Sequence, residues 1–300
     1  MIVLDQDENN AGSFKAALWQ AVQTVAPDEA IEAKDVEVRD GWLYSKGQSK
    51  PMQAMILCSS RTPQPERLLS LAARSTYPRL NPPRSGLVSK PEYQSLLVDL
   101  DIPTPFYHYN VRNTGRAVIK PAYGQAGTGV KIADHADTDY AQAFIANPFQ
   151  VEAGWDIRIV MFMGEPIGAM LRINVQDWRS NTHQGGHPVT FWPMADGKRP
   201  LMHDEVKDAH TKIVRWLGLS QPKAEWYEWG KRISAFTGLQ YFAMDIVVDE
   251  EKKGYVIDIN PSAAQDESRR NMVRVVRALN ILKDKGYLNS NLNVKLNSIL

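Results

Sequence analysis

Two aspartates and an asparagine near the C-terminal end have the residue types and spacing of a metal site. Asp245 interrupts the apolar run 242–248, and Asp258 and Asn260 belong to the largely apolar run 254–260. The acidic, glycine-terminated turn between the runs favours a β-hairpin, and side chains two apart share one face of a strand. The three side chains would then converge, and their oxygen atoms suit Mg²⁺ or Mn²⁺.

The hairpin register decides whether these groups meet. Pairing Val248 with Tyr255 places Asp245 opposite Asp258. Carboxylates facing each other across a strand pair have Cβ atoms about 5 Å apart and repel each other, so the arrangement needs a positive partner. We therefore favour a metal site, and the alternative is a polar hairpin that faces solvent.

A glycine-rich turn, 124–129, is a second candidate site, preceded by the apolar run 117–119 and Lys120. Glycines let backbone N–H groups approach phosphate oxygens. Because a predicted strand at 130–133 follows, rather than a helix, the spacing fits neither the dinucleotide fingerprint nor the Walker loop. Two interpretations stay open, a plain flexible hairpin and a lid over phosphates with Lys120 beneath it.

Three arginines lie on or near another predicted hairpin, 156–173. Arg158 and Arg172 fall on its two strands, and Arg179 follows the second strand. Guanidinium groups bind carboxylate and phosphate oxygens bidentately, although an exposed surface charge is the alternative for any one of them. The glycine pair 185–186 predicts close approach of the backbone to a ligand.

The elements that must position these groups alternate between strands and helices, which predicts an α/β chain. A small open α/β domain is expected first, followed by a proline-rich linker at 77–84. Strands and hairpins then carry most of the candidate groups. The apolar periodicity predicts helices at 14–25, 91–100, 137–145, 204–217, 224–237 and 266–285.

Composition restricts the class of protein. The chain has 300 residues, 43% of them hydrophobic and 23% charged, which excludes disorder and leaves room for about two domains. A formal net charge of +1 argues against a dedicated nucleic-acid binder. The single cysteine, Cys58, rules out an intrachain disulfide and allows a reducing compartment. Since no apolar run approaches the ~20 residues of a membrane span, we expect no membrane association and a cytoplasmic location.

The order of these motifs resembles that of ATP-grasp proteins, in particular the RimK-like amino-acid ligases. The resemblance covers about residues 50–282, and its most specific part runs from Asp156-Ile157-Arg158 to Gly186. It implies the ATP-grasp fold, of class α/β (α+β). The implied parts are an N-terminal α/β domain at 1–84, a central subdomain with the glycine lid at 85–148 and a C-terminal subdomain at 149–300.

The resemblance also implies an activity, that of an ATP-dependent carboxylate–amine ligase. A carboxylate attacks the γ-phosphate of ATP, and an amine captures the acyl phosphate to give an amide, ADP and phosphate. The implied partners are ATP, Mg²⁺ or Mn²⁺, and an amino acid, peptide or protein that supplies the carboxylate or the amine. The alternatives are a non-catalytic or regulatory ATP-binding protein and a carboxylate–thiol or phosphoryl-transfer enzyme of the same fold.

Residue roles follow from the matching motifs. Metal binding falls to Asp245, Asp258 and Asn260. Stabilisation of charge on the γ-phosphate or the acyl phosphate falls to Arg172 and Arg179, and Arg158 is a further implied catalytic residue. The implied ATP contacts are Lys90, Lys120, Gly124, Gln125, Gly127, Glu152, Asp156, Arg179, Ser180 and Asn181.

The sequence departs from the family pattern in four places. Aspartate stands at position 258 where glutamate is usual, and the adenine-contacting segment 149–152 is compressed. Residues 195–225 look like an insertion, and the first 50 residues match no family segment. The insertion and the N-terminal segment are therefore where substrate specificity could lie.

Overall fold

The structure is a computed structural model of mixed helix and sheet. The residues that it describes are 1–4, 14–32, 35–40, 42–52, 55–57, 79–80, 89–109, 116–122, 129–133, 140–149, 153–192, 203–218, 220–260 and 270–289. Cys58 and the expected turn 123–128 lie outside them.

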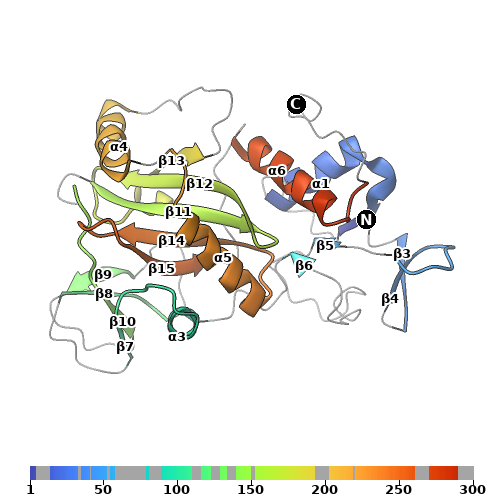
Figure 1. The fold of residues 1–300 in the computed structure, drawn as a ribbon, viewed down its shortest axis with the longest axis horizontal. Helices are drawn as coiled ribbons and strands as arrows, with labels where there is room; N and C mark the ends of the chain where they lie inside the picture. Colours follow the sequence, from blue (N-terminus) through green and yellow to red (C-terminus); the bar gives the residue numbers. More distant parts are fainter. Residues whose placement is uncertain are drawn as a thin grey trace. The chain divides into compact units, whose positions relative to one another are not determined.

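The chain divides into two compact units, drawn in Figure 1. The first unit combines residues 1–86 with 238–241 and 261–300, and the second combines 87–237 with 242–260. The C-terminal segment thus clusters with the N-terminal segment. The three-part division expected from the resemblance stays a prediction.

The first unit contains a four-stranded sheet and a separate hairpin. The sheet has the order β2-β1-β5-β6, and its neighbouring strands pair in parallel. Its strands are β1 (Ile2–Leu4), β2 (Ala30–Glu32), β5 (Met55–Leu57) and β6 (Arg79–Leu80). The separate hairpin consists of β3 (Val36–Arg39) and β4 (Trp42–Ser45), which pair antiparallel. The linker prediction was wrong at 79–80, because these residues add an edge strand to β5.

Two helices pack together in the first unit, α1 (Phe14–Val25) and α6 (Arg270–Asp284). A short 3₁₀ turn, η1 (Pro27–Glu29), follows α1. Phe14, Leu18 and Val22 recur at every fourth position and are buried, as helical periodicity predicts. The ring of Phe14 stacks on Tyr241 with centroids 4.6 Å apart. This apolar face explains why the helix predicted at 14–25 forms where expected.

The second unit contains two sheets. One has the order β7-β10-β8-β9, and the other has the order β13-β12-β11-β14-β15. The smaller sheet consists of β7 (Tyr107–Tyr109), β8 (Ala117–Ile119), β9 (Lys131–Ala133) and β10 (Tyr140–Ala143). The larger sheet consists of β11 (Gly154–Phe162), β12 (Glu165–Asn174), β13 (His187–Trp192), β14 (Tyr241–Val248) and β15 (Gly254–Asn260).

Strand β10 corrects the predicted helix at 137–145. Its residues pair antiparallel with β7 on one side and β8 on the other. Ala141 packs with Ala117 and Ile119, and Gln142 is 2% exposed with its amide hydrogen-bonded. Alanine and glutamine favour helix in isolation, but pairing on both sides and burial outweigh that small preference.

Three helices of the second unit begin and end close to the predicted positions, namely α3 (Lys90–Asp99), α4 (Asp204–Leu217) and α5 (Ala224–Thr237). A short 3₁₀ turn that was not predicted, η3 (Thr182–Gln184), follows β12. Ser89 and Glu92 form a capping box at the start of α3. Helices α4 and α5 both contact β12.

The hairpin of β11 and β12 is the centre of the second unit. Every residue of β11 is buried, although the strand contains Asp156 and Arg158. The turn consists of Met163 and Gly164 at φ +50° and +80°, the geometry of a tight type I′ turn. Buried charges in such a strand require partners of opposite charge.

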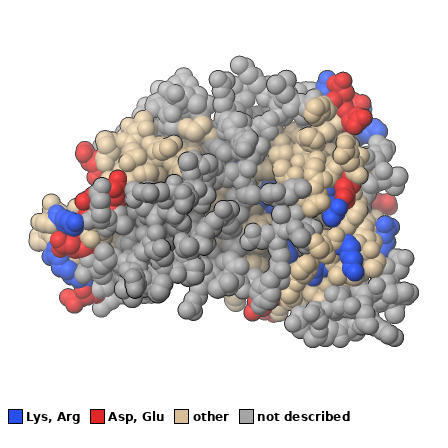
Figure 2. Space-filling model, turned by 180° about the vertical axis from the view of Figure 1, so that it is seen from behind, with Lys and Arg blue, Asp and Glu red and all other residues tan. Residues whose placement is uncertain are grey.

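One face of the molecule carries charges of both signs. On the face drawn in Figure 2, basic and acidic side chains of the described residues are interspersed. No helix within the described ranges is both long and apolar enough to cross a membrane.

Gly154 tests the close packing at the start of β11. A Cβ atom there would lie 2.2 Å from the carbonyl oxygen of Trp178, a backbone atom that cannot move aside cheaply. We expect Gly154→Ala to lower the unfolding midpoint more than Gly218→Ala. The control has open space, so its only cost is the left-handed backbone at φ +67°, about 1–2 kcal/mol. Urea unfolding of both variants measures the difference, and an equal or smaller loss for Gly154→Ala would contradict the packing described.

Candidate active site

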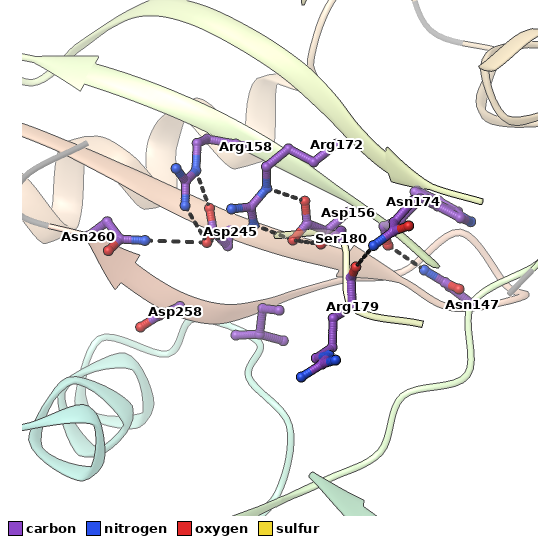
Figure 3. A network of polar contacts seen from close by, with 12 residues as sticks. Asn147, Asp156, Arg158, Arg172, Asn174, Arg179, Ser180, Asp245, Asp258 and Asn260 are labelled. Carbon is purple, nitrogen blue, oxygen red and sulfur yellow. Dashed lines mark hydrogen bonds and ion pairs between the residues drawn. The ribbon is translucent and has the colours of Figure 1, made fainter. Parts of the chain in front are cut away.

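Four buried charged residues form a continuous chain of ion pairs on the larger sheet. Arg158 donates to both oxygens of Asp245, from Nε at 2.7 Å and Nη2 at 2.8 Å. Arg172 donates from Nε to Asp156 at 2.7 Å, and its Nη2 contacts both Asp156 and Asp245. Ser180 donates to Asp156 at 2.6 Å. Figure 3 shows this chain of contacts across β11, β12 and β14.

The network pairs two negative with two positive side chains, all of them at most 7% exposed. Burial alone would disfavour the Asp245 carboxylate, but Arg158 and Arg172 outweigh that effect and hold its pKa below the ordinary value. Burial likewise opposes the charge of Arg172, and Asp156 and Asp245 raise its pKa above the ordinary value. Of the two facing carboxylates, Asp245 therefore has two arginines as its positive partners, whereas Asp258 pairs with Lys90.

Asp245 lies opposite Asp258, as predicted, but the register contains an irregularity. Val248 pairs with Gly254 rather than with Tyr255, and a shift between Asp245 and Ile246 restores the expected pairing. Ile257 has no partner in this register, which makes it the extra residue of a β-bulge.

At the bulge, a backbone carbonyl of β15 accepts hydrogen bonds from residues of the smaller sheet. Successive carbonyl groups of a regular strand point in opposite directions. The carbonyl oxygens of Val256 and Ile257, however, both accept hydrogen bonds from side chains outside β14. Thr104 donates to the first at 2.9 Å. Lys120 and Gln142 donate to the second at 3.0 and 3.3 Å.

Lys120 follows β8 and is 8% exposed. Burial lowers the pKa of its ammonium group to about 8, although the charge of Asp258 opposes that shift. Lys120 can therefore gain or lose its proton at a pH only slightly above neutral.

Lys90 begins α3 and reaches the same region. Its Nζ pairs with Asp258 at 2.7 Å, and its backbone N–H donates to the carbonyl of Ala122 at 2.9 Å. The structure thus brings Lys90, Lys120 and Asp258 together beside the bulge.

The three predicted metal ligands differ in how far their oxygen atoms are already occupied by hydrogen bonds and in how exposed they are. Both oxygens of Asp245 accept from guanidinium groups, and Asn260 Nδ2 lies 3.4 Å from one of them. Asp258 is 21% exposed at its side chain, and Figure 3 shows it apart from the network. Its carboxylate and the amide oxygen of Asn260 are hard donors that fit Mg²⁺. The described residues contain no cluster of three histidine, cysteine, aspartate or glutamate side chains suited to a metal.

The loop after β12 carries Arg179, Ser180 and Asn181. The guanidinium of Arg179 points away from the buried network (Figure 3) and pairs with Asp177 at 2.5 Å. The side chain of Asn181 does not cap the following turn. Arg179 and Asn181 therefore present polar groups that the buried network does not use.

The glycine pair has a different role from the one predicted. Gly185 adopts φ +89° at the end of η3. A Cβ at Gly186 would lie 2.0 Å from the carbonyl oxygen of Ser180. Gly185 is therefore required by its left-handed backbone, and Gly186 by close approach to the loop's own backbone.

Four predicted ATP contacts lie outside the described residues, namely Gly124, Gln125, Gly127 and Glu152. The neighbouring Phe149 has φ +64°, and its ring packs edge-on against Trp216 of α4 at 6.3 Å. Trp155 also contacts Trp216, at 6.2 Å. Part of the apparent insertion thus packs beside the start of the segment expected to contact adenine.

Sequence reasoning missed two residues that organise the site, Asn174 and Gln142. Asn174 ends an apolar strand, where an asparagine often hydrogen-bonds a following turn, so its position was a usable signal. Gln142 lies in the strand mistaken for a helix, and no local pattern marks it.

The fold is similar to that of solved ATP-grasp ligases. The ATP-grasp ligase PsnB complexed with the precursor peptide PsnA2 and AMPPNP matches with a TM-score of 0.51 at 15% identity, covering 93% of this chain and 98% of that chain. PsnB complexed with minimal precursor, Mg and ADP matches with a TM-score of 0.50 at 16% identity, covering 88% of this chain and 89% of that chain. This chain has the ATP-grasp fold. The fold expected from the motif order is thereby confirmed.

Sequence similarity supports the ATP-grasp assignment over a shorter stretch, although no family model matches the chain. The chain is 36% identical over 91 residues to glutathione synthetase of Brucella melitensis biotype 1 and 34% identical over 88 residues to that of Agrobacterium fabrum. These matches cover 26% and 25% of this chain. They span only 29% and 27% of the two curated relatives, less than a third of their length.

Replacing Asp245 tests the buried network. Asp245→Asn leaves Arg158 and Arg172 with one buried carboxylate between them, and removal of one member of a buried ion pair typically costs about 3–5 kcal/mol. Asp258→Asn is the matched control, because its partner Lys90 is partly exposed and such pairs contribute about 0–1 kcal/mol. Equilibrium unfolding in urea compares the two, and equal stabilities would show that Asp245 does not hold the network together.

Proposed function

We propose that this protein is an ATP-dependent carboxylate–amine ligase that works through an acyl phosphate. The observation that supports this most directly is the group of cations beside the bulge of β15, within an ATP-grasp fold. Lys90 and Lys120 lie at the bulge, where phosphate oxygens would replace their present carboxylate and carbonyl acceptors. Phosphoryl transfer depends mainly on such positioning and on charge stabilisation.

Arg179 would stabilise charge on the transferred phosphoryl group. Its Nη1 makes no hydrogen bond with the part of the chain that the structure describes, so donors remain for a ligand. Ser180 and Asn181 would contact the nucleotide or its ions from the same loop. Gly124, Gln125, Gly127 and Glu152 keep their assignment as ATP contacts.

The roles of Arg158 and Arg172 follow from their present partners. Arg158 is already paired with Asp245, and Arg172 with both Asp156 and Asp245, so direct contact with substrate would require either arginine to leave a buried carboxylate. We infer that they support the site electrostatically and fix the surface on which the phosphates lie.

Mg²⁺ fits the oxygen donors of Asp258 and Asn260, and Asp245, whose oxygens now accept from the arginines, keeps its assignment as the third ligand. When bound it would bridge phosphate oxygens and neutralise their charge. Mn²⁺ has the same ligand preference.

The substrate class is an amino acid, peptide or protein that supplies a carboxylate, with an amine as acceptor. The named activity of the glutathione synthetases and the precursor peptide in the PsnB complex support small-molecule and peptide substrates respectively. A non-catalytic ATP-binding role is the second candidate. The three cations favour catalysis, because a protein that only binds nucleotide has less need of Arg179.

Transfer of an oxygen isotope tests the proposed reaction. The protein is incubated with ATP, Mg²⁺, amine acceptors and pools of ¹⁸O-carboxylate amino acids or peptides. If the carboxylate attacks the γ-phosphate and the amine then displaces phosphate, one carboxylate oxygen leaves with the phosphate. Mass spectrometry should detect ¹⁸O in the released phosphate together with a new amide. ATP binding without phosphate release from any pool would favour the non-catalytic role instead.

The pH dependence of ATP binding tests Lys120. Because the pKa of its ammonium group is lowered to about 8, the free site loses this charge as pH rises through that value. We expect ATP affinity, measured by calorimetry, to weaken by up to about tenfold per pH unit above pH 8. Without ATP, the free energy of unfolding should rise over the same range, because the unfolded lysine keeps the proton that the folded one releases.

Lys120→Arg is the control for this pH dependence, since arginine stays charged throughout the range. Its ATP affinity should change little between pH 7.5 and 9.5, two values chosen on either side of the lysine pKa. A parallel pH dependence in both proteins would assign the titration to another group.

A further inference from the structure

A single buried amide holds the loop that carries Arg179. Asn174 is 1% exposed. Its Nδ2 donates to the carbonyls of Arg179 at 2.8 Å and Gln184 at 2.7 Å. Its Oδ1 accepts from the backbone N–H groups of Gln176 at 3.0 Å and Asp177 at 3.2 Å. All four hydrogen-bonding positions of the amide are thus used to fold one loop.

Asp177 then holds the side chain of Arg179. Its Oδ1 accepts from the backbone N–H of Arg179 at 2.9 Å and from Nε at 3.1 Å. Its Oδ2 accepts from Nη2 at 2.5 Å. Hydrogen bonds from Arg179 lower the pKa of the Asp177 carboxyl, so the pair stays charged at neutral pH. One edge of the guanidinium is therefore fixed, and Nη1 is left unbonded among the described residues.

The arrangement is poorly explained by stability alone. The side chains of Arg179 and Asp177 are 26% and 25% exposed, and ion pairs of this kind contribute little to folding free energy. A long, flexible arginine would otherwise sample many rotamers, and ordering it at the moment of reaction would weaken its effect on the transition state. Because Asp177 already holds one edge of the guanidinium, Arg179 does not have to be ordered during the reaction.

We propose that Asp177, supported by Asn174, is a positioning residue that orients Arg179 toward the transferred phosphoryl group. This inference rests on the proposed ligase function. Asp177 acts through Arg179 and does not itself contact substrate. Its removal should therefore affect the rate of phosphoryl transfer rather than the binding of ATP.

The test compares Asp177→Asn with wild type and with Glu228→Gln. Glu228 is an acid of α5 that pairs with Lys231 at 2.8 Å, is 62% exposed and lies outside the machinery described above. In Asp177→Asn we expect kcat to fall about tenfold or more, while the Kd for ATP changes less than about threefold and the unfolding midpoint stays that of wild type. Glu228→Gln should leave all three unchanged.

A double-variant cycle separates positioning from a general change in the loop. In an Arg179→Ala background, Asp177→Asn should have no further effect on kcat, because the residue it positions is gone. Additive losses would overturn the inference, as would an unchanged kcat in the single variant. Asn174→Asp, which replaces both donors to the loop carbonyls, should reproduce the kcat loss if it folds.

Two outcomes distinguish this inference from the function on which it rests. Absence of ATP turnover by wild type with every substrate pool would refute the ligase proposal, and with it the positioning role. Turnover by wild type with full kcat in Asp177→Asn would refute the positioning role alone.

Discussion

The second unit depends on the mutual neutralisation of charges inside its larger sheet. Asp245 accepts from both Arg158 and Arg172, and Arg172 also pairs with Asp156. None of these groups would be tolerated singly in strands buried to this degree, because transfer of an isolated charge from water is prohibitively costly. Together they are neutral, and each strand that contributes one is tied by side chains as well as by backbone to its neighbours. The polar surface beside them can then carry ligands without compromising the sheet.

Two layers of polar structure follow from that constraint. The buried network fixes β11, β12 and β14, and a second set of groups lies around it with free hydrogen-bonding capacity. Lys90 and Lys120 belong to the second set near the bulge, and Arg179 belongs to it on the loop after β12. This separation would allow a near-neutral chain to bind the anionic nucleotide that we propose as its ligand. It also distinguishes residues whose loss would unfold the sheet from residues whose loss would affect chemistry.

Local sequence patterns predicted much of the fold and part of the site. Alternation of apolar residues located both hairpins, and the resemblance of the motif order predicted the ATP-grasp fold. The predicted pairing of Val248 with Tyr255 was wrong, but Asp245 does face Asp258, because the bulge shifts the register by one residue. What the patterns could not give was the partner of each charge, because Arg158 and Asp245 are 87 positions apart and meet only in the folded sheet. Strand β10 was missed for the same reason, since its conformation is decided by neighbours on both sides rather than by its own Tyr-Ala-Gln-Ala sequence. The roles of the individual site residues stay predictions.

The bulge at Ile257 interrupts the regular hydrogen-bonded pairing of β15 with β14. A strand one residue shorter would still place Asp245 opposite Asp258, and its ladder with β14 would be complete. Such a strand would lack the outward carbonyl to which Lys120 and Gln142 donate. The length of this hairpin is therefore set by a contact between the two sheets, and a deletion that looks harmless to the strand itself would disconnect Lys120 from the larger sheet.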